Sequence, residues 1–425
     1  MLWVMAVLPF VLLIVGFPIF LILLATAATA LLFFSSVPAT IAPQVMFDTV
    51  SKYALLAVPF FIFAGELMTR GGLSTRLLNW IDSMIGGFRG SLPLTSLGMA
   101  AVFGSISGAT TAAVAAVGSL TYPRMRKAGY SEGFASALIT AEGALDNLIP
   151  PSIGMILYGV ASDTSISDLF AAGVFPGLLL AGMFALYILY HSARHTTKEV
   201  RQTVSWQAFL QASRQGVWAI LAPVVILGGI YSGLFSPTEA AGVACVYAIL
   251  VSMLIYREIS WRELFDVAAR SVYLTALVFI IVAVAGLYAW LLTITGVAQL
   301  ATNLISSLNL PPWAILLSIN ALLLIVGCFL DPGSAILILT PLLLPIAKTI
   351  GIDPVHFGVV VVMNLTIGTF HPPFGLNIFV CQAMFKVRSS VLYAGLLPFV
   401  GLAVIALLVV TYIPALSLWI LQFVH

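Results

Sequence analysis

The sequence predicts an all-α integral membrane protein with an inverted repeat, two re-entrant hairpins and two discontinuous helices. Composition, the distribution of basic residues and two matched pairs of helix-breaking motifs lead to this fold class. The 425-residue chain is 61% hydrophobic and only 8% charged, whereas a soluble domain carries about 25% charged residues. So few charges cannot cover a water-soluble fold. A net charge of +2 without a basic patch gives no reason to expect a nucleic acid partner.

Long apolar runs make up most of the chain. A helix needs about 20 apolar residues to cross about 30 Å of hydrocarbon. The dominant runs cover residues 2–34, 176–190, 216–230, 240–256, 271–292 and 393–412. The first run lacks the basic start and cleavage site of a signal peptide, so we expect it to be retained. The last stretch, residues 391–424, is long enough for one span or two.

Lysine and arginine gather in alternate loops, which indicates the orientation in the membrane. The basic loops contain Arg70, Arg76 and Arg89; Arg124, Arg126 and Lys127; Arg194, Lys198, Arg201 and Arg214; Arg257, Arg262 and Arg270; and Lys386 and Arg388. Loops 35–50, 162–168, 232–239 and 293–312 contain neither residue type. The positive-inside rule therefore predicts a cytoplasmic N-terminus and a C-terminus on the far side.

The two halves of the chain are related in sequence. A single offset without gaps aligns Pro123 with Pro345, Arg126 with Lys348, Gly129 with Gly351, Pro150 with Pro372, and Pro151 with Pro373. The loop after Thr69 is basic, whereas its counterpart after Thr293 is not. The two copies are therefore expected to enter the membrane from opposite sides, an architecture common among secondary transporters.

Each repeat contains an apolar segment with a polar, glycine-rich interruption near its middle. Residues 92–122 are interrupted at GSISGATT, and residues 313–347 at GCFLDPGS. Two half-depth helices that meet at a tip fit this pattern better than one straight span. Non-helical backbone at that depth is tolerable only against protein or a wet cavity, so we predict two re-entrant hairpins.

Each repeat also contains a span with a double proline, in residues 131–161 and 355–386. Proline removes an N–H donor and clashes with the carbonyl four residues before it, so carbonyl oxygens are freed inside the membrane. Carbonyls and hydroxyls are hard ligands suited to a sodium ion, and the N-terminus of the following half-helix favours an anion.

These stretches supply the predicted sites. The residues predicted to bind Na+ are Ser105, Ser107, Gly143, Pro150, Gly327, Asp331, Gly368, Thr369 and Pro372. The residues predicted to contact substrate, between the hairpin tips, are Thr110, Thr111, Ser334 and Asn377. No arginine lies in these stretches to clamp a carboxylate, so helix N-termini are expected to carry much of the anion recognition. No catalytic residue, no cofactor and no metal other than Na+ is expected.

Several ionisable residues allow two interpretations. Asp331 suits a cation site, and it also suits an N-cap before Pro332. Glu142 and Asp146 are four residues apart and share a face of a helix, which permits a coupling role for protons or cations as well as polar packing. His371 is a candidate pH sensor or anion contact, or a hydrogen-bonded spacer. Ser236 and Glu239 have the spacing of a capping box.

The three cysteines have simpler expectations. Cys245, Cys328 and Cys381 lie inside apolar segments without CxxC spacing. They are expected to be small buried hydrophobic residues rather than disulfides or metal ligands.

At these motifs the sequence resembles the large membrane subunit of the tripartite ATP-independent periplasmic (TRAP) transporters, over about residues 59–398. The strings that carry the resemblance are SGATTAAVAAVGSLTYPRMRKAGY, NLIPPSIGMILYG, GLFSPTEAAGVA, DPGSAILILTPLLLPIAKTIGIDPVHFGVVVV and NLTIGTFHPPFGLNIFV. Two departures stand out. Glu142 and Asp146 lie where the family often has small uncharged residues, and His371 lies where it usually has threonine.

The resemblance implies an elevator-type, sodium-coupled importer of organic acid anions in the bacterial inner membrane. It also implies a small membrane subunit and a periplasmic substrate-binding protein as partners. The expected organisation is N-terminal scaffold helices in 1–58, a first repeat in 59–175, further scaffold helices in 176–270, a second repeat in 271–388, and one or more C-terminal helices in 389–425. The hairpins and broken helices would form a moving transport domain.

Three other functions compete with this one. A self-sufficient anion–sodium symporter of the same superfamily would need no soluble partner. A passive channel can also be built from re-entrant loops. A membrane-embedded hydrolase using Ser105 or Asp331 is a remote alternative, because the sequence shows no credible serine–histidine or paired aspartate arrangement.

Overall fold

The computed structural model describes residues 1–85, 87–108, 110–194, 205–297, 299–300, 302–303 and 310–424, and every regular element in these ranges is a helix. Eight of the described helices are long and apolar enough to cross a membrane. They are η1 with α4 (Tyr53–Arg70), α11 (Ile166–Arg194), α12 (Trp206–Tyr231), α13 with η2 (Pro237–Ile255), α14 (Trp261–Ile294), α16 (Pro312–Phe329), α17 (Pro332–Thr349) and α20 (Ser389–Tyr412). The predicted all-helical membrane fold is confirmed.

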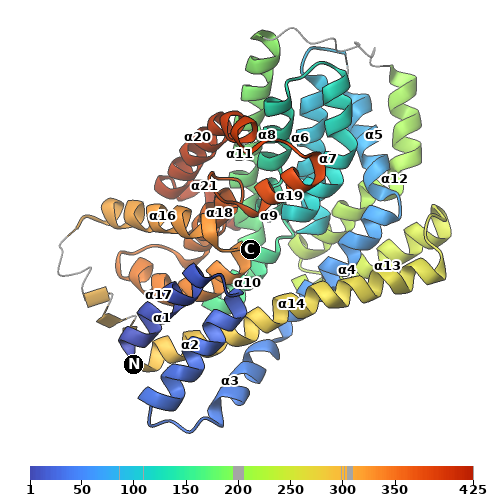
Figure 1. Ribbon diagram of the computed structural model, residues 1–425. Coiled ribbons are helices and arrows are strands. Elements are labelled where there is room, and N and C mark those ends of the chain that lie inside the picture. The colour runs from blue at the N-terminus through green and yellow to red at the C-terminus, as the bar shows by residue number, and fades with distance from the viewer. Residues whose placement is uncertain are drawn as a thin grey trace.

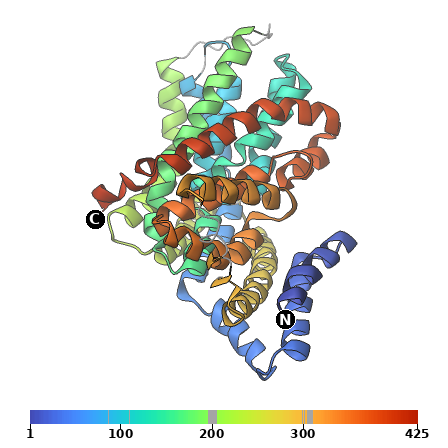
Figure 2. The same ribbon diagram turned by 90° about the vertical axis from the view of Figure 1, so that its left-hand side faces the viewer.

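The terminal segments contribute shorter helices. The N-terminal run forms α1 (Leu2–Val15) and α2 (Ile19–Phe34), followed by α3 (Ile41–Val50). Figure 2 shows these three helices projecting from the rest of the molecule beside α14. At the other end, α20 is followed only by the short helices α21 (Ala415–Leu418) and α22 (Leu421–Val424). The C-terminal apolar stretch is therefore one long helix with two short ones.

Both predicted hairpins are interrupted where the polar motifs lie. In the first, α6 (Ser91–Ser107) packs against α7 (Thr110–Lys127), and Gly108 ends α6 in a left-handed conformation with φ 65°. That conformation costs glycine nothing, because glycine has no Cβ. In the second, α16 ends at Phe329 and α17 begins at Pro332, with Leu330 and Asp331 extended between them. Both of these arms have 18 residues and are therefore longer than the half-depth helices that the sequence suggested.

Both double prolines lie in gaps between helices. The first span is divided into α8 (Glu132–Glu142), α9 (Leu145–Leu148) and α10 (Ile153–Ser162), and the second into α18 (Pro354–Gly368) and α19 (Leu376–Phe385). Each double proline is joined by a cis peptide bond. One expectation needs correction: Glu142 and Asp146 do not lie on one helix, because α8 ends at Glu142 and Asp146 belongs to α9.

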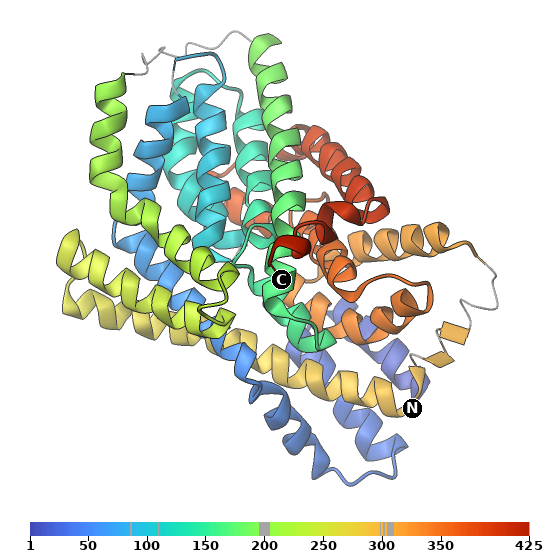
Figure 3. The same cartoon turned by 180° about the vertical axis from the view of Figure 1, so that it is seen from behind.

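The elements of the two repeats surround a common centre. In Figure 1 the pieces α9, α10, α18 and α19 lie between the first hairpin and the second. The long helix α14 crosses the molecule beneath them (Figures 1 and 3) and contacts α2, α3, α4 and α17. Helix α13 packs on α4, α12 packs on α5 (Leu73–Ile85), and α20 packs on α8, α11 and α18.

A buried polar ladder fixes three of these helices to one another. Asn364 of α18 donates to Asn320 of α16 at 2.8 Å, and Asn320 donates to the hydroxyl of Thr411 in α20 at 3.0 Å. Apolar helices gain little from contacting each other rather than lipid tails, so such hydrogen bonds and close packing select the helix register. The ladder ties the first arm of hairpin 2 to the second broken helix.

Helix ends follow the expected local chemistry. The predicted capping box is present, since Ser236 and Glu239 bond to each other's backbone N–H at the start of α13. A second box is formed by Ser260 and Glu263 at the start of α14. Asp331 caps α17. These caps satisfy amide groups that would otherwise lack partners at helix starts.

Candidate functional site

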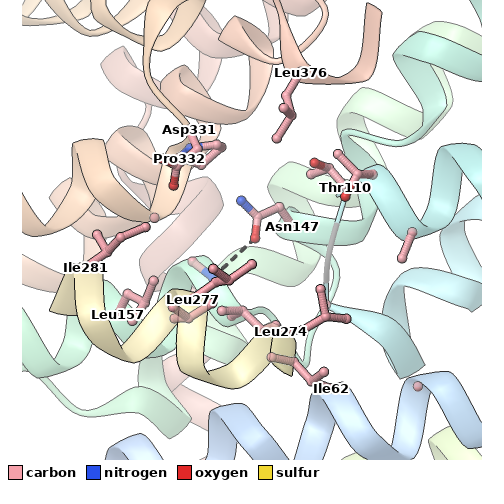
Figure 4. A pocket seen from close by; sticks show the side chains of 18 of the residues that line it. Ile62, Thr110, Asn147, Leu157, Leu274, Leu277, Ile281, Asp331, Pro332 and Leu376 are labelled. Atoms are coloured by element: carbon pink, nitrogen blue, oxygen red, sulfur yellow. Dashed lines mark hydrogen bonds between the residues drawn. The ribbon is translucent and has the colours of Figure 1, made fainter. Parts of the chain in front are cut away.

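A cavity of about 450 Å³ lies where the two repeats meet. Figure 4 shows Asn147 near its middle, with Asp331 on one side, Thr110 on the other and the aliphatic side chains of α14 below. Its lining comes from Ile62, Gly65, Glu66 and Thr69 of α4; Gly108, Thr110, Thr111 and Ala112 of hairpin 1; Asn147, Ile153, Gly154 and Leu157 of the first broken span; Leu274, Leu277, Val278 and Ile281 of α14; Asp331, Pro332, Gly333, Ser334 and Leu337 of hairpin 2; and Leu376 of α19. This size suits a small organic molecule.

Four helices begin at this cavity. Its lining includes the first residues of α7 (Thr110), α10 (Ile153), α17 (Pro332) and α19 (Leu376). The start of a helix carries unpaired N–H groups and roughly half a positive charge. Four starts in one cavity therefore create a region that favours an anion, even though the described lining contains neither lysine nor arginine.

The charged side chains of the lining are acidic. Glu66 lies at the edge of the cavity, where its carboxylate is 3.7 Å from Arg70 Nε and 4.0 Å from Arg270 Nε. Asp331 accepts hydrogen bonds from the backbone N–H of Ser334 at 2.9 Å and from its hydroxyl at 2.5 Å. The predicted N-cap role of Asp331 is therefore confirmed, and its carboxylate faces the cavity as well.

Asn147 links the two broken spans at the centre. Its Nδ2 donates to the Thr366 hydroxyl of α18 at 3.0 Å, and its Oδ1 accepts from the Gly154 N–H and the Ser152 hydroxyl at 3.2 Å each. These bonds fix the start of α10 relative to α18 and hold the Asn147 amide against the cavity. Sequence reasoning did not select Asn147.

Each hairpin tip packs directly on the broken span of its own repeat. A Cβ added to Gly104 would lie 2.7 Å from the Asp146 Cα, and one added to Gly108 would lie 3.1 Å from the Pro151 carbonyl oxygen. In the second repeat, a Cβ added to Gly368 would lie 2.3 Å from the carbonyl carbon of Gly327. Glycine at these positions brings main chain against main chain, which places carbonyl groups close together.

Several of the residues predicted to bind a cation lie at or beside these contacts. Gly143 ends α8 against the Thr110 carbonyl and Asn377, and buried Pro150 precedes the start of α10. Thr369 is buried with its hydroxyl on the Thr366 carbonyl at 2.7 Å, and Pro372 follows it in the gap before α19. The side chains of Ser105 and Ser107 lie outside the described residues.

Of the four residues predicted to contact substrate, the structure brings three to the cavity. Thr110, Thr111 and Ser334 line it. Asn377 does not belong to the described lining: it is fully buried, and its Nδ2 donates to the Thr140 carbonyl at 3.3 Å. This places Asn377 behind hairpin 1, against Gly143.

The acidic residues of the first broken span are deeply buried. Glu142 is 1% exposed, and its Oε1 accepts from the Ser96 hydroxyl of α6 at 2.6 Å, while its Oε2 has no hydrogen-bond partner among the described residues. Asp146 is 0% exposed beside Gly104. A buried charge in this setting is costly without a compensating cation.

The wall formed by α4 and α14 was also missed by sequence reasoning. Leu274, Leu277, Val278 and Ile281 have the i, i+3, i+4, i+7 spacing of one helix face. That spacing is visible in the sequence, but an apolar stripe in a membrane helix does not distinguish a cavity wall from a lipid-facing surface.

Comparisons with known proteins agree with the architecture. The family model for the tripartite ATP-independent periplasmic transporter, DctM component, matches residues 6–416. A C4-dicarboxylate TRAP transporter large permease protein from Pseudomonas aeruginosa is 40% identical, over 93% of this chain and 92% of the relative. An isethionate TRAP transporter permease protein, DctMQ, from Oleidesulfovibrio alaskensis is 38% identical over 96% of this chain, which spans only 64% of that relative.

A solved structure shares the fold. The YdaH transporter of Alcanivorax borkumensis has a TM-score of 0.68 and 15% identity, with 98% of each chain covered. At that identity the similarity concerns the fold alone.

The contact between Gly327 and Gly368 allows a direct test. In Gly368→Ala the new methyl group meets main chain that cannot rotate away, so we expect a loss of about 1–3 kcal/mol of stability together with loss of transport. The matched control is Gly242→Ala in α13, where nothing lies within 4 Å of the added Cβ. Thermal unfolding of both purified variants in detergent measures the difference, and equal melting temperatures would contradict the close contact.

Proposed function

Because this chain belongs to the DctM family of tripartite ATP-independent periplasmic transporters, we propose that it imports an organic acid anion by sodium-coupled, elevator-type alternating access. The observation that carries the proposal is the cavity into which four helices direct their N-terminal ends. Such a site attracts a carboxylate or sulfonate without a basic side chain. C4-dicarboxylates and isethionate, which the names of two relatives mention, are anions of this kind.

The acidic side chain of Asp331 supports cation coupling. The Asp331 residue lines the cavity, so an anionic substrate bound there would face its carboxylate, and two like charges in a low-dielectric space repel each other. A cation between them removes that repulsion and gives the anion a partner. Sodium fits the available oxygen ligands, which are carbonyls, hydroxyls and a carboxylate.

Buried acidic groups near the first hairpin supply a second candidate for coupling. Glu142 and Asp146 lie where hairpin 1 contacts its broken span. A cation bound there would pair with the free Oε2 of Glu142 and hold α6 against α8 and α9. His371 occupies the corresponding region of the second repeat and is a further candidate for coupling.

Alternating access then requires the repeats to move relative to the wall of the cavity. We propose that the hairpins and broken spans form the transport domain and that α4 and α14 belong to the scaffold. In the orientation given by the basic loops, Glu66, Arg70 and Arg270 mark the cytoplasmic end of the cavity. During release, the carboxylate of the substrate can displace Glu66 and pair with Arg70 and Arg270.

The proposed partners are a small membrane subunit and a periplasmic substrate-binding protein. The relative named DctMQ is longer than this chain, which spans 64% of it, and its name supports a second membrane component. The same orientation places the N-terminus in the cytoplasm of a bacterial cell and the C-terminus on the periplasmic side of its inner membrane.

Reconstitution tests the function as a whole. The subunit is placed in proteoliposomes with its small membrane subunit, and uptake of a panel of radiolabelled C4-dicarboxylates and small sulfonates is measured. We expect uptake only with an inward sodium gradient and with the binding protein present. Uptake without the binding protein would identify a self-sufficient symporter, uptake without sodium would contradict the coupling, and no uptake of any anion would contradict the substrate class.

The cation role of Asp331 can be separated from its capping role. Asp331→Asn and Asp331→Ser both remove the charge, whereas serine and asparagine both remain good N-caps. We expect each variant to need about tenfold more sodium for the same thermal stabilisation, measured with potassium as the reference ion. If both variants keep the wild-type sodium response, Asp331 is a cap and not part of the cation site.

Glu142 offers a parallel test in the first repeat. Glu142→Gln keeps the shape and the contact with Ser96 but removes the charge, so we expect about a tenfold rise in the sodium concentration that gives half-maximal stabilisation. Glu132→Gln, at the start of the same helix, is the matched control. A Glu142→Gln variant that responds to sodium like the control would show that Glu142 serves packing alone.

A further inference from the structure

The end of α16 is joined to the second double-proline loop by three consecutive contacts. Gly327 packs main chain to main chain on Gly368. The next residue, Cys328, has its Sγ 3.3 Å from the Nδ1 of His371. The third, Phe329, packs its ring on Phe374 with centroids 5.4 Å apart. The sulfur–imidazole pair is therefore held between two packing contacts.

The loop itself is anchored from a third helix. The Tyr393 hydroxyl of α20 donates to the Pro373 carbonyl at 2.6 Å. On the other side, the backbone N–H groups of Phe370 and His371 donate to the carbonyls of Ile367 and Gly368 at 3.1 and 3.4 Å. These bonds fix the main chain of the loop around His371 independently of its contact with Cys328.

Cys328 differs from the other two cysteines in its surroundings. Each of the three Sγ atoms contacts a main-chain carbonyl: Cys245 that of Phe60, Cys381 that of Ser136, and Cys328 that of Leu324 at 3.2 Å. Cys245 and Cys381 are buried. Cys328 and His371 are both only half-buried. The expectation that all three cysteines are buried is therefore wrong for Cys328, which is partly exposed at the protein surface together with its imidazole partner.

The spacing of the two donor atoms suits a tetrahedral metal ion. Zinc lies about 2.3 Å from a thiolate sulfur and about 2.0–2.1 Å from an imidazole nitrogen. Two such ligands at a tetrahedral angle are about 3.5 Å apart, close to the 3.3 Å between Cys328 Sγ and His371 Nδ1. A shift of a few tenths of an ångström admits the ion. Water completes its coordination from the exposed side, and the thiol proton leaves to solvent.

We propose that Cys328 and His371 form a binding site for a thiophilic divalent metal ion, such as Zn2+ or Cd2+, that fastens hairpin 2 to the second broken span. The first repeat lacks this site: at the offset that aligns the double prolines, the corresponding residues are Ile106 and Ile149. The bound ion therefore acts on one repeat only. Two protein ligands are fewer than the four of a structural zinc site, so we expect the ion to bind reversibly.

A metal ion that joins the tip of hairpin 2 to the second broken span restricts the movement of the second repeat. The end of α16, the end of α18 and the loop after it contribute Gly327, Gly368 and Thr369, which are predicted cation ligands. A metal bridge between neighbouring residues prevents these segments from separating. Metal binding does not depend on the proposed function, but the resulting inhibition of uptake does.

Cadmium binding can be measured without any transport. Titration of the detergent-purified chain with Cd2+ should produce the ultraviolet sulfur-to-cadmium charge-transfer band. We expect Cys328→Ser to abolish the band and Cys245→Ser and Cys381→Ser to retain it. His371→Thr should weaken Cd2+ affinity about tenfold or more, since loss of a ligand costs at least as much as loss of an outer contact.

Each result decides the proposal. No band in the wild type, a band that survives Cys328→Ser, or an affinity unchanged by His371→Thr would each overturn the paired site. Uptake in proteoliposomes provides the second readout: micromolar Zn2+ should inhibit the wild type and spare Cys328→Ser. If cadmium binds at the pair and zinc leaves active wild-type uptake unchanged, the fastening of hairpin 2 is refuted and the metal site stands. A preparation without uptake refutes the proposed function instead.

Discussion

The structure depends on one constraint: a peptide group inside a bilayer must find a partner other than water. The chain interrupts four of its membrane segments and therefore has to surround each interruption with protein. It does so by packing each hairpin tip on the broken span of the same repeat. The contacts of Gly104 with Asp146 and of Gly327 with Gly368 leave no room for a side chain. The helix breaks therefore depend on these glycines, because a side chain at these positions would keep the two main chains apart.

The same helix breaks also determine the chemistry of the cavity. A helix that stops inside the membrane must start again, and each restart brings N–H groups and the positive end of a helix dipole to the site, although Asp331 and Asn147 accept some of these N–H groups at α17 and α10. Because both repeats restart toward a common centre, the starts of α7, α10, α17 and α19 all reach the cavity. The site therefore favours anions through its backbone. This leaves the side chains free to be small, hydroxylated or acidic, as Thr110, Ser334 and Asp331 are.

Short sequence motifs predicted those features that depend only on residues close together in the chain. The hairpins, the double-proline breaks, the Asp331 cap and the Ser236–Glu239 box follow from Gly, Pro, Asp and Ser at fixed spacings. The sequence could not show where α8 stops, because Gly143 is packed against Thr110 and Asn377 from distant segments. Likewise, the role of Asn147 depends on Thr366, more than 200 residues away. Periodicity detects a helix but does not identify the partner across a cavity.

The two repeats share backbone breaks but differ in the side chains placed at them. At the aligned positions, Asp146 corresponds to Gly368, Asn147 to Thr369 and Ile149 to His371. A perfectly symmetric inverted repeat would give its two access states equal energy, because each would be the mirror of the other. Different side chains at the aligned positions make the energies of the two access states unequal. A buried carboxylate at one break and a half-buried imidazole beside a thiol at the other differ in the ions they suit, so the ion binding proposed above would stabilise the two repeats unequally. A ligand shifts a two-state equilibrium only through such a difference in affinity, and in this chain the difference lies at the breaks themselves.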